Sequence, residues 1–249
     1  MNSLPPIWAP APAQWTLDDD EVHVWCAALD LPGDAVQRLW PLLAADESSR
    51  ASRYVFARDR THFVVARGLL RVILARYLDL EPAALRFVYG AYGKPALAHD
   101  TGGVALRFNL SHSGGYVLYA VTHQRELGID IERMRPGFAR EGGIAERFFS
   151  PHEVAALRAL PLSLQATAFF ACWSRKEAYI KARGLGLAIP LESFDVSLTP
   201  GEPAALLHTA DGPQETSRWA MQELAPVPGY AAALAVAGHD WRLRCWRWE

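Results

Sequence analysis

Hydrophobic and polar positions alternate along the chain with periods that predict strands and helices in turn. Residues 21–29 alternate as a strand does, and Pro32 and Gly33 end this run before a helical pattern that reaches Leu43. Residues 59–80 follow a helical period and predict a long amphipathic helix. Its apolar face would carry Phe63, Ala66, Leu70, Ile73 and Tyr77.

The second half of the pattern resembles the first in outline. Short β-rich segments are predicted at residues 86–89, 106–110, 116–122 and 127–132. A helical block over residues 150–183 follows, which Pro161 splits into two helices, and late strands are predicted at 194–198, 218–224 and 241–248. The pattern therefore predicts an α+β fold of two similar subdomains packed face to face, residues 1–123 and 124–249.

Composition narrows the class of protein. The chain has 249 residues, of which 51% are hydrophobic and 21% are charged, as expected of a globular protein. Its net charge of −2 argues against nucleic acid as a partner, because modules that bind polyanions usually have a strongly basic surface. Any chemistry on phosphates must then depend on a local group of cations.

Compartment and membrane association are also constrained. Cys26, Cys172 and Cys245 are odd in number and far apart, so neither a disulfide framework nor a zinc site is predicted. The first sixteen residues lack the features of a signal peptide, and charge interrupts every apolar run well before the roughly 20 residues that span a bilayer. We expect a cytoplasmic protein with no membrane partner.

Two carboxylates lie two residues apart in the predicted strand GIDIE. Asp130 and Glu132 would share one face of this strand, while Ile129 and Ile131 face the other side. Such a pair is costly to bury unless a cation neutralises it, and carboxylate oxygens suit magnesium or manganese. The alternative is an exposed strand face with two solvated acids.

The helical segment WSRKEAYIK, residues 173–181, contains the next candidates. Glu177 and Lys181 are spaced for an intrahelical ion pair, which is the structural explanation of their presence. However, Glu177 falls on a face with Trp173 and Phe170, and a carboxylate on an apolar face needs a partner. Lys176 points in another direction from Lys181, because they are five residues apart.

A third group of polar residues lies in FNLSHSGG, residues 108–115. There we predict a strand that ends in a turn whose backbone amides, with Ser111, His112 and Ser113, could bind phosphate. Serine and glycine are also what any tight turn prefers. Cations precede this segment in the sequence, and they are either solvated or able to hold a polyphosphate: Arg50, Arg53, Arg58, Arg60 and Lys94.

The segments GKP, FNLSHS, GIDIE and WSRKEAYIK, in this order and at these separations, resemble the 4′-phosphopantetheinyl transferase superfamily. The length and the apparently doubled layout are similar to its Sfp-type branch. The resemblance runs from about Leu42 to Val196. It implies a pseudo-twofold α+β fold and a monomeric enzyme that transfers the phosphopantetheine arm of coenzyme A to a serine of acyl- or peptidyl-carrier proteins, releasing adenosine 3′,5′-bisphosphate.

The resemblance also implies roles for individual residues. Asp130, Glu132 and Glu177 would hold magnesium, with manganese as a substitute. Glu177 would also act as the base towards the carrier serine, and Lys181 would lie against the pyrophosphate, so these two are the expected catalytic residues.

Coenzyme A would be the co-substrate, in the cleft between the halves. Lys94, Ser111, His112 and Lys181 would contact its nucleotide and phosphates, with Arg50 and Arg53 nearby. The chain departs from the family pattern upstream of Tyr54, where Glu47 stands among the arginines. The resemblance therefore does not identify the residues that hold the 3′-phosphate.

The carrier protein is expected beside the loop at residues 184–187. Arg175 and Arg183 are either complements to an acidic carrier or ordinary helix charges. Two other functions would use the same residues. A metal-dependent hydrolase of nucleotide pyrophosphates would turn over without a carrier, and a non-catalytic protein that binds coenzyme A would not need a divalent metal.

Overall fold

The computed structural model describes residues 6–98, 106–135 and 143–248. Helices and strands alternate in two rounds, which confirms the predicted α+β class. The elements of the first half are β1 (Trp8–Pro10), β2 (Glu21–Ala28), α1 (Gly33–Leu39), α2 (Ala45–Ser52), α3 (Ala57–Leu78), β3 (Phe87–Tyr89), β4 (Pro95–Leu97), β5 (Leu106–Ser113) and β6 (Tyr116–His123). The elements of the second half are β7 (Leu127–Arg133), α4 (Ile144–Phe148), α5 (Pro151–Ala159), α6 (Leu162–Arg183), β8 (Phe194–Val196), β9 (Leu206–Thr209), α7 (Pro213–Arg218), β10 (Trp219–Leu224), β11 (Tyr230–Ala237) and β12 (Arg242–Trp248).

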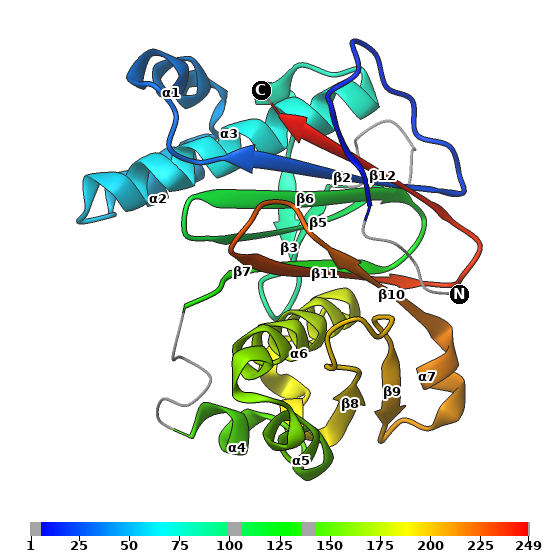
Figure 1. Ribbon diagram of the computed structural model, residues 1–249. Coiled ribbons are helices and arrows are strands. Elements are labelled where there is room, and N and C mark those ends of the chain that lie inside the picture. Colours follow the sequence, from blue (N-terminus) through cyan, green and yellow to red (C-terminus); the bar gives the residue numbers. More distant parts are fainter. Residues whose placement is uncertain (1–5, 99–105, 136–142, 249) are drawn as a thin grey trace.

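The long elements stack in four layers (Figure 1). Helix α3 covers a five-stranded sheet with the strand order β1-β12-β2-β6-β5, and α6 covers a three-stranded sheet with the order β10-β11-β7. One buried apolar cluster fills the interface between α3 and the larger sheet, a second lies between the two sheets, and a third lies beneath α6. The two sheets therefore pack on each other and turn their outer faces to the two long helices.

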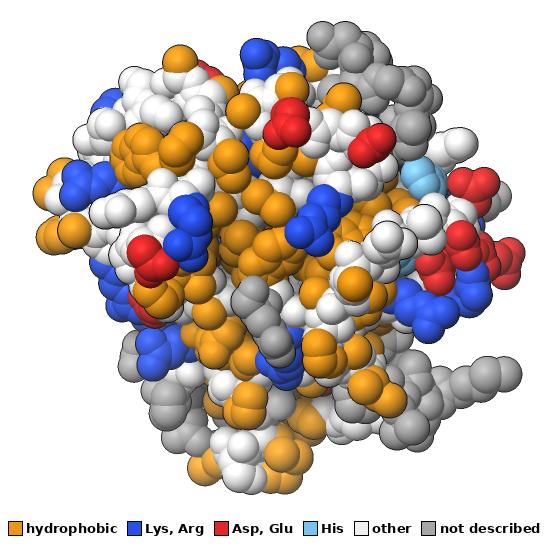
Figure 2. Space-filling model, turned by 90° about the horizontal axis from the view of Figure 1, so that it is seen from above, with side chains coloured by type: hydrophobic (Ala, Val, Ile, Leu, Met, Phe, Trp, Pro, Cys, Tyr) orange, Lys and Arg blue, Asp and Glu red, His pale blue; other side chains and the backbone are white. Residues whose placement is uncertain are grey.

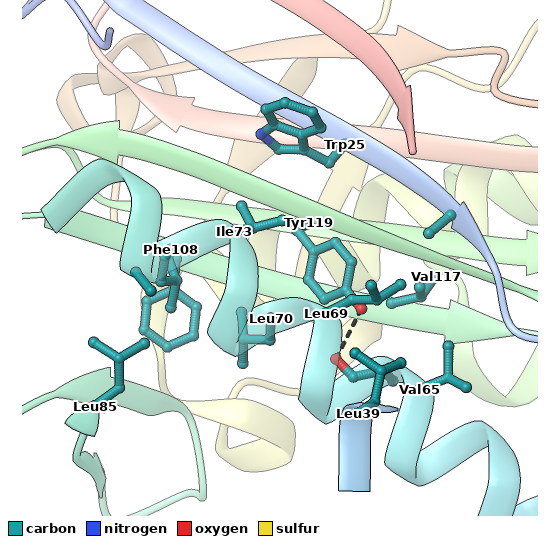
Figure 3. Packing of buried hydrophobic residues seen from close by; sticks show 14 of the residues in the cluster. Trp25, Leu39, Val65, Leu69, Leu70, Ile73, Leu85, Phe108, Val117 and Tyr119 are labelled. Atoms are coloured by element: carbon teal, nitrogen blue, oxygen red, sulfur yellow. Dashed lines mark hydrogen bonds between the residues drawn. The ribbon is translucent and has the colours of Figure 1, made fainter. Parts of the chain in front are cut away.

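The α3 cluster shows why residues 59–80 have their pattern. Leu70 and Ile73 are completely buried against the sheet, as the helical period predicts (Figure 3). Tyr119 on β6 donates a hydrogen bond from its hydroxyl to the carbonyl of Ala66 at 2.8 Å. The helix ends at Asp79, which adopts the left-handed conformation that commonly terminates helices.

The helical block of the second half also follows its prediction. Pro161 separates α5 from α6, and α6 ends at Gly184 in a left-handed conformation. Helix α5 begins at Ser150, whose side chain accepts a hydrogen bond from the amide of Glu153, and Glu153 returns a bond to the Ser150 amide.

The two halves share one topology. In each, a strand of the main sheet precedes a 22-residue helix. A short two-stranded sheet follows the helix, and then two further strands of the main sheet, the last of which pairs with both others. The strand orders are β2-β6-β5 and β7-β11-β10. Strand β12 then returns to pair with β2. The pseudo-twofold axis and the boundary after residue 123 stay predictions.

Some parts of the pattern were interpreted incompletely. The helical pattern after Gly33 breaks at Leu39, and a 3₁₀ turn at Trp40–Leu42 replaces its end because Pro41 supplies no amide for an α-helical bond. Strand β11 was not predicted, although it is the central strand of its sheet. Its sequence YAAALAVA lacks alternation, since it is packed on both faces.

Viewed from above, Lys, Arg, Asp and Glu side chains are scattered around apolar surface and form no continuous basic face (Figure 2). Among the described residues, no helix combines the length and the apolar character needed to cross a membrane.

Candidate active site

Helix α6 approaches β7 very closely at Gly128, the glycine of GIDIE. A Cβ atom at this position would lie 2.1 Å from the carbonyl oxygen of Ala178 and 2.3 Å from the amide nitrogen of Ala182. Only glycine fits such an approach of two backbones. The short distance brings the carboxylates that follow on β7 beneath the last turns of α6.

Asp130, Ser111 and Lys181 form a closed hydrogen-bonded triangle. The Lys181 ammonium donates to Asp130 Oδ1 at 2.6 Å and to Ser111 Oγ at 2.9 Å, and Ser111 donates to the same Asp130 oxygen at 2.8 Å. These three residues come from β7, β5 and α6. The site therefore uses elements of both halves: Asp130 and Lys181 belong to the second half, and Ser111 reaches them from the first.

The two other carboxylates lie close enough to interact with Asp130 electrostatically. Glu132 accepts a hydrogen bond from Ser113 Oγ at 2.8 Å, and burial together with the charge of Asp130 raises the pKa of Glu132. Burial, followed by the charge of Asp130, likewise raises the pKa of Glu177, while Lys181 opposes this shift. Since Asp130 is only 2% exposed, the interpretation of GIDIE as a solvated acidic face is wrong.

The donor chemistry of this cluster fits a divalent cation. Asp130 Oδ2 is buried and has no hydrogen-bond partner within the described part of the chain, and three carboxylates share a single nearby lysine. Hard oxygen ligands of this kind suit magnesium. In the described ranges, no three or more His, Cys, Asp or Glu side chains are already arranged to hold a metal ion. The Lys181 ammonium occupies the position beside Asp130 instead.

Strand β5 corrects the prediction for FNLSHSGG. The strand was expected to end before Ser111, but pairing with β6 continues to Ser113, so Ser111 and His112 are strand residues. Successive strand residues point to opposite faces. Ser111 and Ser113 face the carboxylates, while His112 faces the α3 side. Asn109 belongs to the first set and accepts a hydrogen bond from the amide of Ile129 at 2.9 Å, which ties β5 to β7.

A cavity of about 340 Å³ lies on the α3 side of β5, and we call it the α3 cavity. Arg50 and His112 line it, as do His62 and Arg67, which the sequence analysis did not single out. The surrounding protein and the charges of Lys181, His62 and Arg50 lower the pKa of His112. Arg53 caps the end of α2, is exposed and is not among the residues that line this cavity.

A second cavity of about 240 Å³, the α6 cavity, contains Lys94 and Lys181 together with Tyr92, and shares Leu110 with the α3 cavity. The Lys94 ammonium donates to the carbonyl oxygens of Leu127 at 3.0 Å and Ala182 at 3.1 Å. Lys94 therefore lines the expected cleft while also tying the β3–β4 turn to β7 and α6. Burial lowers its pKa, although Glu126 opposes the shift.

The cations of WSRKEAYIK divide as their spacing predicts. Lys176 is completely buried and pairs with Glu153 at 2.7 Å, away from Lys181. Arg175 is only 1% exposed and pairs with Glu223, so it cannot present a charge to a carrier protein. Arg183 contacts Asp211 and Glu215. For Arg175, the interpretation as a carrier contact is wrong because its guanidinium is buried and bonded to Ser197 and Glu223.

Several contacts in the site were missed by the sequence analysis. Asn109 lies two positions before Ser111, so the period of two that grouped Asp130 with Glu132 could have grouped these residues as well. Arg67 and His62 lie on the predicted long helix, but no local pattern distinguishes them from solvated helix charges. Only the packing of α3 beside β5 brings them to the cavity.

Comparison with known proteins identifies the family of this chain. Residues 126–235 match the family model of the 4′-phosphopantetheinyl transferase superfamily, and residues 34–124 match the model "4′-phosphopantetheinyl transferase, N-terminal". The 4′-phosphopantetheinyl transferase HetI of Nostoc sp. is 42% identical over 97% of this chain and 98% of its own length. The 4′-phosphopantetheinyl transferase Sfp of Bacillus subtilis is 31% identical over 82% of this chain and 86% of its own length.

More distant proteins extend the comparison. The human L-aminoadipate-semialdehyde dehydrogenase-phosphopantetheinyl transferase is 30% identical over 78% of this chain and 58% of its own length. A solved structure, "Chronobacterium ammoniagenes ACPS-CoA complex", covers 47% of this chain at 22% identity with a TM-score of 0.35. That structural likeness is too low to support a conclusion, whereas the near-complete match to HetI is decisive. The chain belongs to the 4′-phosphopantetheinyl transferase superfamily, in its Sfp-like branch, and is a phosphopantetheinyl transferase.

Proposed function

We propose that the donor is coenzyme A, that a magnesium ion bound by Asp130, Glu132 and Glu177 assists the transfer, and that the acceptor is a serine of an acyl- or peptidyl-carrier protein. Transfer of phosphopantetheine to carrier proteins is the activity of the family. The observation that carries the assignment of the site is the cluster of three carboxylates with Lys181 and Ser111 at the meeting of β7, α6 and β5.

Magnesium would be held by carboxylate oxygens that the protein leaves incompletely neutralised. The strongest support is Asp130, which is buried and has an oxygen without a hydrogen-bond partner in the described part of the chain. When bound, the ion would neutralise phosphate charge and stabilise the leaving phosphate. Manganese, which accepts the same ligands, is expected to substitute.

Lys181 and Glu177 would supply the remaining chemistry. The Lys181 ammonium would give up its hydrogen bond to Asp130 and donate instead to a phosphate oxygen of coenzyme A. Glu177 would take the proton of the carrier serine. The serine oxygen then bonds to the β-phosphorus, the bond from that phosphorus to the bridging oxygen breaks, and adenosine 3′,5′-bisphosphate leaves with the electron pair.

The nucleotide would occupy the two cavities that share Leu110 as a lining residue. His112 and Arg50 line the α3 cavity and would face its phosphates, with Arg53 at the rim. Lys94 lines the α6 cavity, where its alkyl chain would contact the nucleotide while its ammonium stays on two carbonyls. Ser111 would stay on the carboxylate side and orient Asp130.

The described residues that line the two cavities all belong to one chain, and we propose that the enzyme works as a monomer. The cysteine pattern leads us to propose a cytoplasmic location. The carrier would dock beside residues 184–187, which adjoin the α6 cavity and include the exposed Leu185.

Intact-mass spectrometry of an apo carrier protein tests the donor and the metal together. With coenzyme A and magnesium, the carrier should gain one phosphopantetheine arm, and chelation of the metal should abolish the gain. Modification that continues after complete chelation would exclude the metal from the mechanism.

Titration of manganese into the protein tests the ligands without relying on activity. Asp130→Asn should weaken the binding of the ion, while Asp195→Asn, in the β8–β9 pair away from the cluster, should not. Equal affinities in all three proteins would place the metal elsewhere.

A further inference from the structure

We propose that Arg67 is a further specificity-determining residue, which binds the 3′-phosphate of coenzyme A from the inner wall of the α3 cavity. The inference rests on the proposed function, because it takes coenzyme A as the donor. It assigns a role to a residue on α3 that the sequence analysis did not single out.

Arg67 is buried, but its guanidinium is only partly bonded. Its Nε lies 3.5 Å from Glu47 Oε1, and its Nη2 donates to the Tyr89 hydroxyl at 3.3 Å. The guanidinium also lies over the ring of Phe87, 5.2 Å from the ring centroid. Nη1 is buried and has no hydrogen-bond partner among the described residues. An unpartnered donor on a charged group is costly, so this nitrogen favours an anionic partner.

The charges around Arg67 leave a positive excess. Glu47 is the carboxylate beside it, but Glu47 Oε2 accepts a hydrogen bond from Arg71 Nε at 2.7 Å and another from the Ala44 amide. Glu47 therefore serves mainly Arg71, and two guanidiniums share one carboxylate. Since Arg67 is 8% exposed and lines the cavity, the excess charge lies at the cavity wall.

Other side chains of the α3 cavity add to this charge. Arg50 lines the cavity, and so do two imidazoles, His62 and His112. Asp59 is the carboxylate among the lining residues, and the bonded partner of His62 is Asp30. The cavity therefore suits a dianion such as a phosphate monoester.

Coenzyme A carries two anionic groups, and the fold separates two sites for them. The Ser111 side of β5 faces the carboxylates and Lys181, where the pyrophosphate reacts. The His112 side faces the α3 cavity and Arg67. The 3′-phosphate is the second anionic group, and it belongs on the His112 side. Nη1 is shielded from water in this structure. The guanidinium therefore has to turn towards the ligand before Nη1 can donate a hydrogen bond to the phosphate.

Calorimetric titration with two ligands tests the proposal. Coenzyme A and dephospho-coenzyme A, which lacks only the 3′-phosphate, are titrated into wild-type enzyme and Arg67→Gln in the same magnesium buffer. Loss of a charge-assisted hydrogen bond should weaken coenzyme A binding about 10-fold or more, while dephospho-coenzyme A should change less than about twofold. Arg67→Lys should recover part of the preference, because it restores the charge without the planar geometry.

Two observations separate a binding role from a structural one. Glu47 keeps Arg71 and the Ala44 amide as partners in Arg67→Gln, so the fold should persist, which the melting temperature of the variant checks. Arg86→Gln is the matched control, because Arg86 donates to carbonyls of residues 83–85 and does not line the cavity. This control should bind both ligands as the wild type does.

The outcomes distinguish the inference from the proposed function. Equal weakening of both ligands in Arg67→Gln, or no change in either, overturns the role of Arg67 and leaves coenzyme A as the donor. A wild-type enzyme that binds both ligands equally has no 3′-phosphate site, which also overturns the inference. If the wild type binds neither ligand, the proposed donor itself is wrong.

Discussion

The two halves of the chain share a buried ion pair at matching positions. Arg71 is the fifteenth residue of α3, and Lys176 is the fifteenth residue of α6. Each cation pairs at 2.7 Å with a glutamate, Glu47 or Glu153, whose carboxylate also accepts from the backbone amide at the start of its own helix. Each cation further donates to carbonyls of the segment after its long helix. The same device fixes both helices.

The faces that these helices present to the sheets differ. Asp130 on β7 pairs with the fourth residue of β11, and Trp25 on β2 pairs with the fourth residue of β6. Asp130 binds Lys181 of α6, whereas the Trp25 ring packs 4.5 Å from that of Trp15. Arg76 matches Lys181 in its helix, and its guanidinium stacks on Trp15 at 4.6 Å. In the first half, aromatic rings thus occupy the positions that correspond to the candidate site of the second half.

The position next to the buried cation shows the same contrast. Glu177 follows Lys176, and Val72 follows Arg71. In the first half, β12 pairs with the outer edge of β2. In the second half, the corresponding edge strand is β7, and Ser111 of β5 donates a hydrogen bond to Asp130 on it. Both halves therefore keep the ion pair that fixes the long helix, whereas only the second half carries the carboxylates and Lys181 of the candidate site.

Exchange of Glu177 for glutamine should have the largest effect of these changes, and the effect should be on the transfer rate. Glu177→Gln keeps the shape but removes a proposed base and metal ligand, so the transfer rate should fall by about 10²-fold to 10⁴-fold. The melting temperature should hold or rise, because a carboxylate repelled by Asp130 is removed. Carrier modification followed by mass spectrometry measures the rate.

Val72→Ala is the matched control in α3. It should lower stability by about 1 kcal/mol and leave the rate unchanged. Comparable loss of rate in both variants would show that the two faces do not differ in function.

Removal of the buried cation should cost stability in both halves, and more in the second. Lys176→Met leaves Glu153, which is 1% exposed, without a cation, and should cost about 3–5 kcal/mol. Arg71→Met should cost less, because Arg67 remains 3.5 Å from Glu47. Urea unfolding of both variants measures the difference. A larger loss for Arg71→Met would contradict the proposed order.

A methyl group at Gly128 should disturb the close approach of α6. Gly128→Ala places its Cβ against the backbone of Ala178 and Ala182, so it should cost stability near the upper end of about 1–3 kcal/mol and slow transfer as α6 shifts. The matching residue on β2 is His23, whose ring nitrogen lies 2.7 Å from the Tyr77 hydroxyl, so the first half has room for side chains there. A melting temperature like that of the wild type would refute the need for glycine.

The smallest expected effect is the contribution of His23 to the pH dependence of stability. Burial lowers the pKa of His23 below 6.5, although Glu21 opposes the shift. The unfolded chain then binds more protons than the folded protein as the pH falls through 6.5, so stability is lost below that pH. Between about pH 7.5 and pH 5.5, wild-type stability should fall more than that of His23→Gln, as urea unfolding at each pH would show. Parallel curves would mean that His23 does not contribute.

Local signals predicted the elements that have one polar and one apolar face, or clear ends. Helix α6 begins after Pro161 and ends at Gly184, and Asp130 shares a face with Glu132, as the sequence indicated. Strand β11 was missed because it is apolar on both faces, which removes alternation. The partners of the cations were not predicted from the sequence. Arg175 and Arg183 lie in the same helical pattern, but Arg175 pairs with Glu223 and Arg183 with Asp211.

The sequence by itself determined the order of helices and strands, the pairing of carboxylates on one strand face and the family to which the chain belongs. These depend on periods and spacings within a few residues. The tertiary structure decided that Lys181 contacts Asp130 and that Arg67 reaches the cavity with an unpartnered nitrogen. It also decided that tryptophans fill the matching face of the first half. Such contacts join residues far apart in the chain, and the packing of helices on sheets places them.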